Sequence, residues 1–320
     1  MSAPTPSYNL WSGTLAAHGS DALQAELLEA VLADHVAMCL LYSEPSAGSD
    51  LAGVRTTAVK DGDRWIVNGQ KVWTSAARDA DYGMLLARTD WDVPKHRGLT
   101  FFWLPMRQPG VLVRPLRQIT GDSRFNQVFL TEARIPDTHR LGQVGDGWRV
   151  LHTALAYERA VMGVAPRTAR PGRTAAAFGN IPSPDVSLVE LARSVGVNHD
   201  AVFRQRIARL YCLTMVNGWN SRRAADAGDA SLASIGKLAM SGILHEAGRL
   251  QAHILGVEAT LDGDRHPVAR DANYSQMNAY FTSIGGGTDQ IQRNIIGERI
   301  LGLPREPEPD RDLPFRSIPT

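Results

Sequence analysis

Two segments in the first quarter of the chain hold residue types that suit a binding site. YSEPSAGSD, residues 42–50, joins small residues to the hydroxyls of Ser43 and Ser49, and small residues let backbone approach a ligand. KVWTS, residues 71–75, places Trp73 beside two hydroxyl residues, which suits a planar polar ring system. An ordinary polar loop and a buried core tryptophan are the alternative interpretations of these two segments.

A third segment, SIGGGTDQIQ at residues 283–292, runs three glycines into a helical stretch that Thr288 or Asp289 can cap. Helix N-termini present free N–H groups and attract phosphate. The segment is not a Walker loop, because no GKS or GKT follows the glycines. It suits a dinucleotide phosphate or a carbonyl oxygen, and a flexible hinge is the alternative.

Glu158 is the most informative single residue. Leu151, Leu155, Glu158 and Met162 recur at the spacing of one helical face that is otherwise apolar. Burying an isolated charge is costly, so a carboxylate on such a face is either paired or kept for function. Partial burial makes a carboxylate a stronger general base. The alternative is an ordinary surface acid at a wet edge of the helix.

The elements that must position these residues fall into four predicted segments. Residues 1–37 are a Pro/Ser-rich start followed by a helix, and residues 38–145 hold about six short strands, typical of an antiparallel barrel or sandwich. Turns are expected at Asp61-Gly62 and at Asn68-Gly69. Residues 146–304 have helical periodicity, and residues 305–320 form an irregular tail rich in proline and charge.

The helical segment predicts several boundaries. A first helix runs from Trp148 to about Val164, and a loop rich in Pro, Arg and Gly follows at roughly 165–182. The next helix ends at Gly196, Asp200 caps a long one, and another ends at Gly256. A last helix covers 289–302. The sequence thus predicts an α+β protein with a β domain followed by a helical bundle.

Composition excludes several classes of function. A net charge of +1 over 320 residues gives no electrostatic case for nucleic acid or an anionic membrane surface. No apolar run reaches the roughly 18 residues of a membrane helix, and the first residues do not resemble a secretory signal. The histidines lack metal-ligand spacing, so no metal is expected. Two sparse cysteines favour a reducing, cytoplasmic location.

Taken in order, seven segments of the chain resemble the acyl-CoA dehydrogenase family. They are AAHGSDALQAELLEAVLAD, LLYSEPSAGSDLAG, DRWIVNGQKVWTSAA, NQVFLTEARIPD, VGDGWRVLHTALAYERA, VFRQRIARLY and IGGGTDQIQRNIIGERILGLP. The resemblance implies an N-terminal helical domain, here truncated, a middle antiparallel β-barrel domain and a C-terminal four-helix bundle. It also implies bound FAD, an acyl-CoA substrate, and an electron-transfer flavoprotein as acceptor. In this chemistry a base removes the α-proton while the β-hydride passes to the flavin.

The resemblance assigns roles to residues at matching positions. Tyr42, Ser43, Trp73 and Ser75 match flavin contacts, and Ser49, Arg159, Gly286 and Gly287 match contacts on the substrate side. Contacts to the FAD of a neighbouring subunit match Arg193, Gln251 to Gly256, Thr288, Asp289 and Gln290.

The chain departs from the family pattern at the base. Most members carry their catalytic glutamate in the glycine loop, at the position of Gly286, whereas a minority place it on the first bundle helix, at the position of Glu158. The resemblance and the helical stripe therefore both indicate Glu158. Most of the family's N-terminal domain has no counterpart here, which implies an open pocket for a bulky acyl group, such as a steroid side chain, or one completed by a partner chain.

The partner-flavin segments also diverge, because the segment ARSVGVNHD lacks the aromatic residue that usually precedes its glycine. Divergent short members occur in heteromeric α2β2 enzymes. We therefore expect a FAD-dependent acyl-CoA dehydrogenase, or one subunit of it, in a homo- or hetero-oligomer built as a dimer of dimers. A non-catalytic partner subunit that completes a companion's site is one alternative, and an acyl-CoA oxidase-like flavoenzyme is another.

Overall fold

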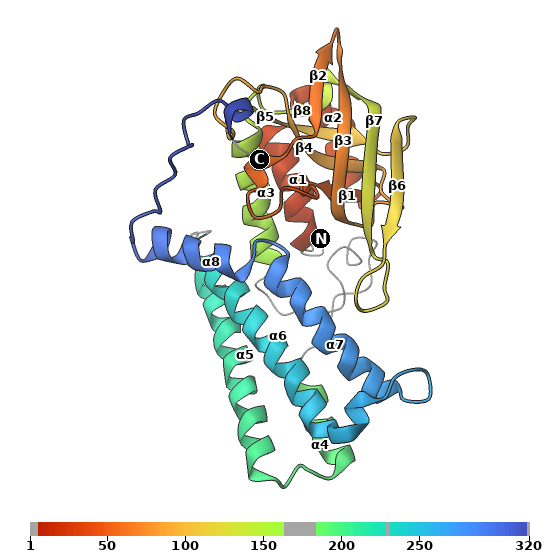
Figure 1. Ribbon diagram of the computed structural model, residues 1–320, viewed down its shortest axis with the longest axis vertical. Helices are drawn as coiled ribbons and strands as arrows, with labels where there is room; N and C mark the ends of the chain where they lie inside the picture. The colour runs from red at the N-terminus through yellow and green to blue at the C-terminus, as the bar shows by residue number, and fades with distance from the viewer. Residues whose placement is uncertain (1–5, 163–183, 228–230, 319–320) are drawn as a thin grey trace. The chain divides into compact units, whose positions relative to one another are not determined.

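The computed structural model describes residues 6–162, 184–227 and 231–318 (Figure 1). These residues form two compact units. The β unit contains residues 6–157 and 306–318, and the helical unit contains residues 158–162, 184–227 and 231–305. The expected loop at 165–182 lies outside the described residues. Every helix of the described ranges is too short or too polar to cross a lipid bilayer.

The β unit is built on one mixed sheet of eight strands. Seven of its strands lie side by side in the order β6-β7-β3-β2-β4-β5-β8. The eighth strand, β1, pairs with β4. The strands are β1 (Met38–Leu41), β2 (Thr57–Asp61), β3 (Arg64–Ser75), β4 (Tyr82–Arg88), β5 (Leu99–Pro105), β6 (Val111–Leu116), β7 (Phe125–Pro136) and β8 (Arg140–Leu141). The α+β class and the middle β domain are thereby confirmed.

The observed sheet differs from the predicted antiparallel barrel in two details. The sheet of the described residues is open, with β6 and β8 at its two ends, and both β1 and β2 pair with β4 in parallel. Parallel neighbours need a crossover connection instead of a hairpin. β1 reaches β4 through β2 and β3, and the long segment between β1 and β2 carries YSEPSAGSD.

Of the two expected turns, one forms and one does not. Gly62, at a φ of 60°, joins β2 to β3 as predicted. Asn68-Gly69 instead lies inside β3, where the register with β7 shifts between Val67 and Gly69. A Cβ at Gly69 would lie 2.7 Å from the Cα of Thr56, so glycine is required there for close packing and not for a turn.

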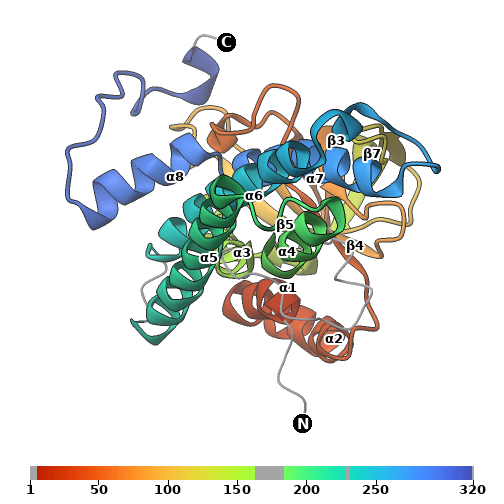
Figure 2. The same ribbon diagram turned by 90° about the horizontal axis from the view of Figure 1, so that it is seen from below.

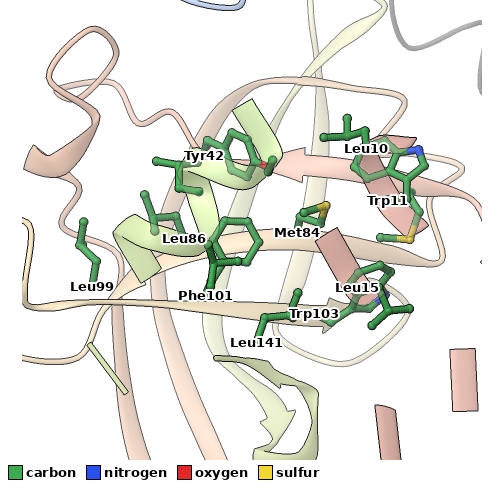
Figure 3. Close-up of a cluster of buried hydrophobic side chains, with 14 of the residues drawn as sticks. Leu10, Trp11, Leu15, Tyr42, Met84, Leu86, Leu99, Phe101, Trp103 and Leu141 are labelled. Atoms are coloured by element: carbon green, nitrogen blue, oxygen red, sulfur yellow. The ribbon is translucent and has the colours of Figure 1, made fainter. Parts of the chain in front are cut away.

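The N-terminal segment holds two helices where one was expected, α1 (Pro6–His18) and α2 (Asp21–Leu32). They lie side by side in Figure 2. Figure 3 shows Leu10, Trp11 and Leu15 of α1 among the buried side chains of the sheet, which include Met84 and Trp103. Burying each large apolar side chain of this kind contributes about 1.5–3 kcal/mol, so this short helical start is part of the β unit's core.

The helical unit contains the helices that follow α3 (Gly147–Met162), and the boundary between the units falls within α3, after Tyr157. Its helices are α4 (Pro184–Val195), α5 (Ala201–Ala227), α6 (Ala233–Leu255), α7 (Pro267–Ile284) and α8 (Asp289–Ile295), followed by a π-helical turn, Ile296–Ile300. α6 is central and packs against the other four (Figure 1). The predicted ends at Gly196 and Gly256 are confirmed by φ angles of 82° and 59°.

The predicted cap at Asp200 is also confirmed, since its Oδ1 accepts from the N–H groups of Val202 and Phe203 at 2.7 and 3.3 Å. α7 was not predicted. The last helix, expected as one element, ends at Ile295 and passes into the π-helical turn. The irregular tail returns to the β unit, where Phe315 N–H donates to the carbonyl of Val93 at 3.0 Å.

Candidate active site

In the β unit, the segment after β1 is held against β3 by a buried ion pair. Lys71 Nζ lies 2.8 Å from Glu44 Oε1 and also donates to the carbonyls of Tyr42 and Leu86, at 2.9 and 2.8 Å. Its three donors therefore have three acceptors. The backbone N–H of Val72 donates to the carbonyl of Ser43 at 2.9 Å. These bonds bring Tyr42 and Ser43 beside the end of β3, which carries Trp73 and Ser75.

The Glu44 carboxylate is the centre of this connection. Besides Lys71, it accepts from the backbone N–H groups of Arg55 and Thr56 at 2.6 and 2.9 Å. Burial opposes its charge, but Lys71 and these donors outweigh burial and lower the pKa of Glu44. Burial lowers the pKa of Lys71 to about 8, against the opposing effect of Glu44. Both buried charges are compensated, so the pair fixes the loop in one conformation.

Trp73 has the geometry of a functional side chain. Its φ is 63°, a left-handed conformation that is costly for a bulky residue. It lies where the β3–β7 register shifts between Lys71 and Thr74, and a bulge of this kind turns a side chain away from its strand's alternation. The side chain is 58% exposed, with its ring edge-on to Phe125 at 6.0 Å between centroids. The buried-core interpretation of Trp73 is therefore wrong.

The surroundings of Trp73 fit a planar, polar cofactor. Thr74 and Asn126 face each other across β3 and β7 and are both buried. Thr74 Oγ1 and Asn126 Oδ1 have no hydrogen-bond partner within the described ranges. Buried polar atoms without partners usually indicate a missing ligand or water. An exposed indole beside unmatched polar atoms and the hydroxyls of Ser43 and Ser75 suits a flavin.

Ser49 lies elsewhere on the same loop. It is exposed, and its neighbour Asp50 pairs with Lys95 at 2.9 Å. The loop end is further held by Arg88, a fully buried side chain that donates to the carbonyls of Ala52 and Val54 at 2.6 and 3.1 Å. Burial lowers the pKa of Arg88 to about 10. The β unit thus fixes both ends of YSEPSAGSD from within the sheet.

In the helical unit, the glycine loop, residues 285–287, is held by hydrogen bonds from residues of the same unit. Gly286 and Gly287 have φ angles of 66° and 86°, which glycine adopts without a steric penalty. Thr288 Oγ1 caps α8 by accepting from the N–H of Ile291 at 3.2 Å. The fully buried Gln292 donates through Nε2 to the carbonyls of Gly286 and Gly287, at 3.0 and 3.3 Å. The loop is therefore a defined turn, which argues against a flexible hinge.

Asp289 is engaged within its own chain. Its Oδ2 accepts from Ser241 Oγ at 2.8 Å, and its Oδ1 lies 3.3 Å from Nζ of Lys237, a fully buried lysine of α6. Gln290 next to it is exposed. Ser241, Gln292 and Lys237 were not predicted, although the helical spacing of Lys237 with Met240 and Ala247 places it on the buried face of α6.

Glu158 is 8% exposed, at the position where the apolar stripe of α3 places it. It is not an ordinary exposed acid. Burial lowers the pKa of Lys237, and the Asp289 and Glu158 carboxylates both oppose that effect. Two carboxylates, Glu158 and Asp289, thus act on one buried ammonium. Arg159 follows in α3, and its side chain lies outside the described part of the chain.

The remaining predicted cofactor positions lie apart from this group. Arg193 is exposed near the end of α4. Gln251 lies on α6, and its Oε1 is buried without a hydrogen-bond partner among the described residues. Gly256 ends the helix with a positive φ. An unmatched Gln251 oxygen leaves a place for a donor from a ligand or from a neighbouring chain.

Comparison with known families matches two parts of the chain. Residues 39–131 match the acyl-CoA dehydrogenase middle domain, and residues 197–301 match the acyl-CoA dehydrogenase C-terminal domain. The acyl-CoA dehydrogenase IpdE1 of Mycobacterium tuberculosis is 36% identical over 300 residues, covering 92% of this chain and 74% of IpdE1. FadE34 of the same organism is 38% identical over 298 residues. That match covers 91% of this chain and only 39% of FadE34, so the chain spans less than half of that relative.

Solved structures agree with these matches. A chain of the Tcur3481–Tcur3483 steroid ACAD superimposes with a TM-score of 0.81 at 26% identity, covering 95% of this chain and 77% of the other. A chain of the ChsE4–ChsE5 complex from Mycobacterium tuberculosis gives a TM-score of 0.78 at 28% identity, with 95% and 79% covered. With the fold, the matched domains and IpdE1 in agreement, the chain belongs to the acyl-CoA dehydrogenase family of FAD-dependent oxidoreductases.

Proposed function

We propose that this chain catalyses the α,β-dehydrogenation of an acyl-CoA thioester, with Glu158 as the base that removes the α-proton. The observation that carries the proposal is the buried Glu158 carboxylate on α3, together with a glycine loop whose usual base position is Gly286. A carboxylate shielded from water is a stronger base than an exposed one. Glu158 stands at the position of the first bundle helix where a minority of family members carry the base, so it would supply the carboxylate that the glycine loop lacks.

Several residues of the chain support the reaction besides the base. Gly286 and Gly287, which lack side chains, let the thioester carbonyl approach backbone, and the Gln292 side chain keeps that turn in one conformation. In the β unit, Trp73, Ser75 and Ser43 would hold the flavin ring, and the Lys71–Glu44 pair positions their segments. When bound, FAD supplies the hydride acceptor.

The substrate class proposed is a bulky, steroid-like acyl-CoA, with an electron-transfer flavoprotein as acceptor. Support for the acyl group comes from relatives, because one structural neighbour at 26% identity is a steroid ACAD. The test is a panel of CoA thioesters with steroid side chains and with straight chains of increasing length. A preference for straight chains, measured as kcat/KM, would contradict this part of the proposal.

The base assignment is tested by Glu158→Gln, which keeps the size of the side chain and removes its basicity. We expect turnover to fall by about 10²–10⁴-fold, the usual contribution of a general base, with flavin content unchanged. Glu190→Gln is the matched control, since Glu190 is an exposed acid of α4. Turnover retained in Glu158→Gln would show that the base lies elsewhere.

A second candidate function is a non-catalytic subunit that completes a companion's active site. It is favoured by the structural neighbours, since the ChsE4–ChsE5 structure is a complex of two differently named chains. The two candidates differ in flavin content. The chain is purified alone and with the products of neighbouring genes, and flavin absorbance is measured per subunit. A chain that stays without flavin in every complex would support the second candidate.

A further inference from the structure

The tail of the chain is anchored on the β unit by one buried aromatic side chain. Residues 306–313 are exposed throughout, whereas Phe315, in the short 3₁₀ turn Phe315–Ser317 (dark blue in Figure 1), is only 4% exposed. Its ring lies over the guanidinium of Arg88, with 3.5 Å from Cζ to the ring centroid. Trp91 packs against the same ring at 5.3 Å between centroids. A cation on an aromatic face is most favourable where water is excluded, as it is around the fully buried Arg88.

The segment between β4 and β5 also binds the tail. The backbone N–H of Phe315 donates to the carbonyl of Val93 at 3.0 Å, and that of Arg316 donates to the carbonyl of Trp91 at 3.1 Å. The Arg316 guanidinium pairs with both carboxylate oxygens of Asp92, at 2.5 and 2.6 Å. A two-point pair of this kind fixes orientation as well as distance. The tail anchor, which we define as residues 314–317, is therefore held at several points.

Arg88 connects the tail anchor to the YSEPSAGSD loop. Its Nη2 and Nε donate to the carbonyls of Ala52 and Val54, at 2.6 and 3.1 Å. Its Nη1 donates to the carbonyl of Lys95 at 3.1 Å, and the Lys95 ammonium pairs with Asp50 at 2.9 Å. The cation that lies under the tail's aromatic ring thus binds the backbone directly after the loop. The segment that binds the tail also binds the last residue of the loop.

Resting on the proposed function, in which this loop contacts flavin and substrate, we propose that Phe315 and Arg316 are positioning residues for YSEPSAGSD. The tail anchor keeps water from Arg88 and fixes the segment between β4 and β5, and both of these hold the far end of the loop. Without the aromatic ring, water would reach the guanidinium and compete for the donors that now bind loop carbonyls. The far end of the loop would then open more often.

The two ends of the loop depend on different contacts. The Lys71–Glu44 pair holds its start, which carries the residues that match flavin contacts. Ser49, the match to a substrate-side contact, is next to Asp50 at the end that the tail anchor stabilises. Loss of the anchor should therefore affect the substrate side of the site more than the flavin side.

Amide hydrogen exchange of the cofactor-free full chain tests this link without turnover. In Phe315→Ala, peptides that span residues 51–56 should exchange about tenfold faster, the size of one desolvated cation–π contact. Peptides that span 125–136 in β7 should keep the wild-type rate. Phe315→Tyr retains the aromatic face and should restore protection, and Leu313→Ala, an exposed tail position, is the matched control. A side chain that only adds to global stability would change both sets of peptides or neither.

Steady-state kinetics of the flavin-loaded protein gives a second readout. In Phe315→Ala and in Arg316→Met, the KM for the CoA thioester should rise about fivefold, while kcat stays within about twofold of the wild type. Flavin content should be unchanged. The reason for this split is that Glu158 belongs to the helical unit and the anchor to the β unit. Arg311→Met removes an exposed cation of the tail and should leave KM unchanged.

The outcomes separate this inference from the proposed function. Turnover retained in Glu158→Gln would remove the base assignment, and hydrogen exchange would still decide whether the tail positions the loop. Unchanged exchange at 51–56 in both Phe315→Ala and Arg316→Met, or equal acceleration in β7, would overturn the inference. A fall in kcat with an unchanged KM would also overturn it. If Phe315→Ala does not fold, Arg316→Met decides by the same two measurements, because Arg316 is exposed and its replacement leaves the aromatic ring in place.

Discussion

At the scale of single residues, Trp73 is the side chain whose backbone conformation is hardest to explain by folding alone. Trp73 combines a left-handed φ with a side chain that is more than half exposed, so the residue has neither core packing nor a relaxed backbone. Strain of this kind persists where the surrounding structure imposes it, and it concentrates at functional sites. The bulge that exposes the indole is therefore consistent with a contact to a planar ligand.

Replacing Trp73 separates the strain from the contact. Trp73→Gly and Trp73→Ala both remove the indole, but only glycine relieves the left-handed φ. We expect the cofactor-free Trp73→Gly protein to have a free energy of unfolding about 1 kcal/mol higher than Trp73→Ala, measured by urea denaturation. Both variants should lose flavin, measured by absorbance. Normal flavin content in both would contradict the assignment of Trp73 to the cofactor site.

Residue types alone led to some of these side chains and not to others. Trp73 and Glu158 were predicted, since an aromatic beside hydroxyls and an acid in an apolar stripe are local patterns. Lys71 and Lys237 were not, because a lysine in a strand or helix is usually solvated and its burial depends on a distant carboxylate. Glu44 and Asp289 lie 27 and 52 residues away from them, beyond any local pattern.

At the scale of elements, the segment between β1 and β2 behaves as one rigid loop. Glu44 ties its start to β3 through Lys71, and Arg88 of β4 ties its end. The loop has little secondary structure, so these charged contacts replace the strand pairing that would otherwise hold it. The site residues Tyr42 and Ser43 depend on this arrangement for their position.

The loop should therefore respond to acid. Because the pKa of Glu44 is lower in the folded chain than its ordinary value of 4.5, its stabilising effect is complete above about pH 4.5. That effect is lost as the pH falls through the folded-state value. Between pH 5 and 3, the free energy of unfolding of the wild type should thus fall more steeply than that of Glu44→Gln.

At pH 7, Glu44→Gln should itself cost about 3–5 kcal/mol, because Lys71 loses its buried partner. Urea denaturation across this pH range measures both effects. Glu132→Gln is the control, since Glu132 is an exposed acid of the same unit. Parallel pH profiles for the wild type and Glu44→Gln would show that the ionisation of Glu44 is not linked to folding.

The sequence predicts best those features of the elements that depend on a few adjacent residues. The ends at Gly196 and Gly256 and the cap at Asp200 depend on a few adjacent residues. α7 was missed because it packs through small residues, Ala269, Ala272 and Ala279, so it lacks an apolar stripe. Pro267 at its first turn was the available signal. The open sheet could not be predicted, because strand order depends on contacts between distant segments.

At the scale of the whole molecule, α5 presents an apolar stripe to the surface of the helical unit. Tyr211, Met215 and Trp219 recur at every fourth residue and are 51%, 37% and 57% exposed, with Val216 beside them at 46%. Exposed apolar groups of this kind usually mark an interaction surface. We propose that α5 contributes to the subunit contact of a homo- or hetero-oligomer.

Charge in this stripe should weaken assembly. Trp219→Glu places a carboxylate in the proposed contact, and each 1.4 kcal/mol lost raises the dissociation constant about tenfold. Sedimentation velocity over a range of concentrations should show a smaller species than the wild type. Val268→Glu, an exposed apolar position of α7, is the control. An unchanged mass for Trp219→Glu would place the subunit contact elsewhere.

The contact of Phe315 with Arg88 determines when the β unit can complete its folding during synthesis on the ribosome. The aromatic ring covers the guanidinium at 3.5 Å, and Arg316 pairs with Asp92 at 2.6 Å, so the last part of the chain completes a unit begun by the first. More than 200 residues separate the two partners. A ribosome adding about 5–20 residues per second delivers Phe315 roughly 10–45 s after Arg88. The β unit can therefore finish folding only after the entire helical unit has been synthesised.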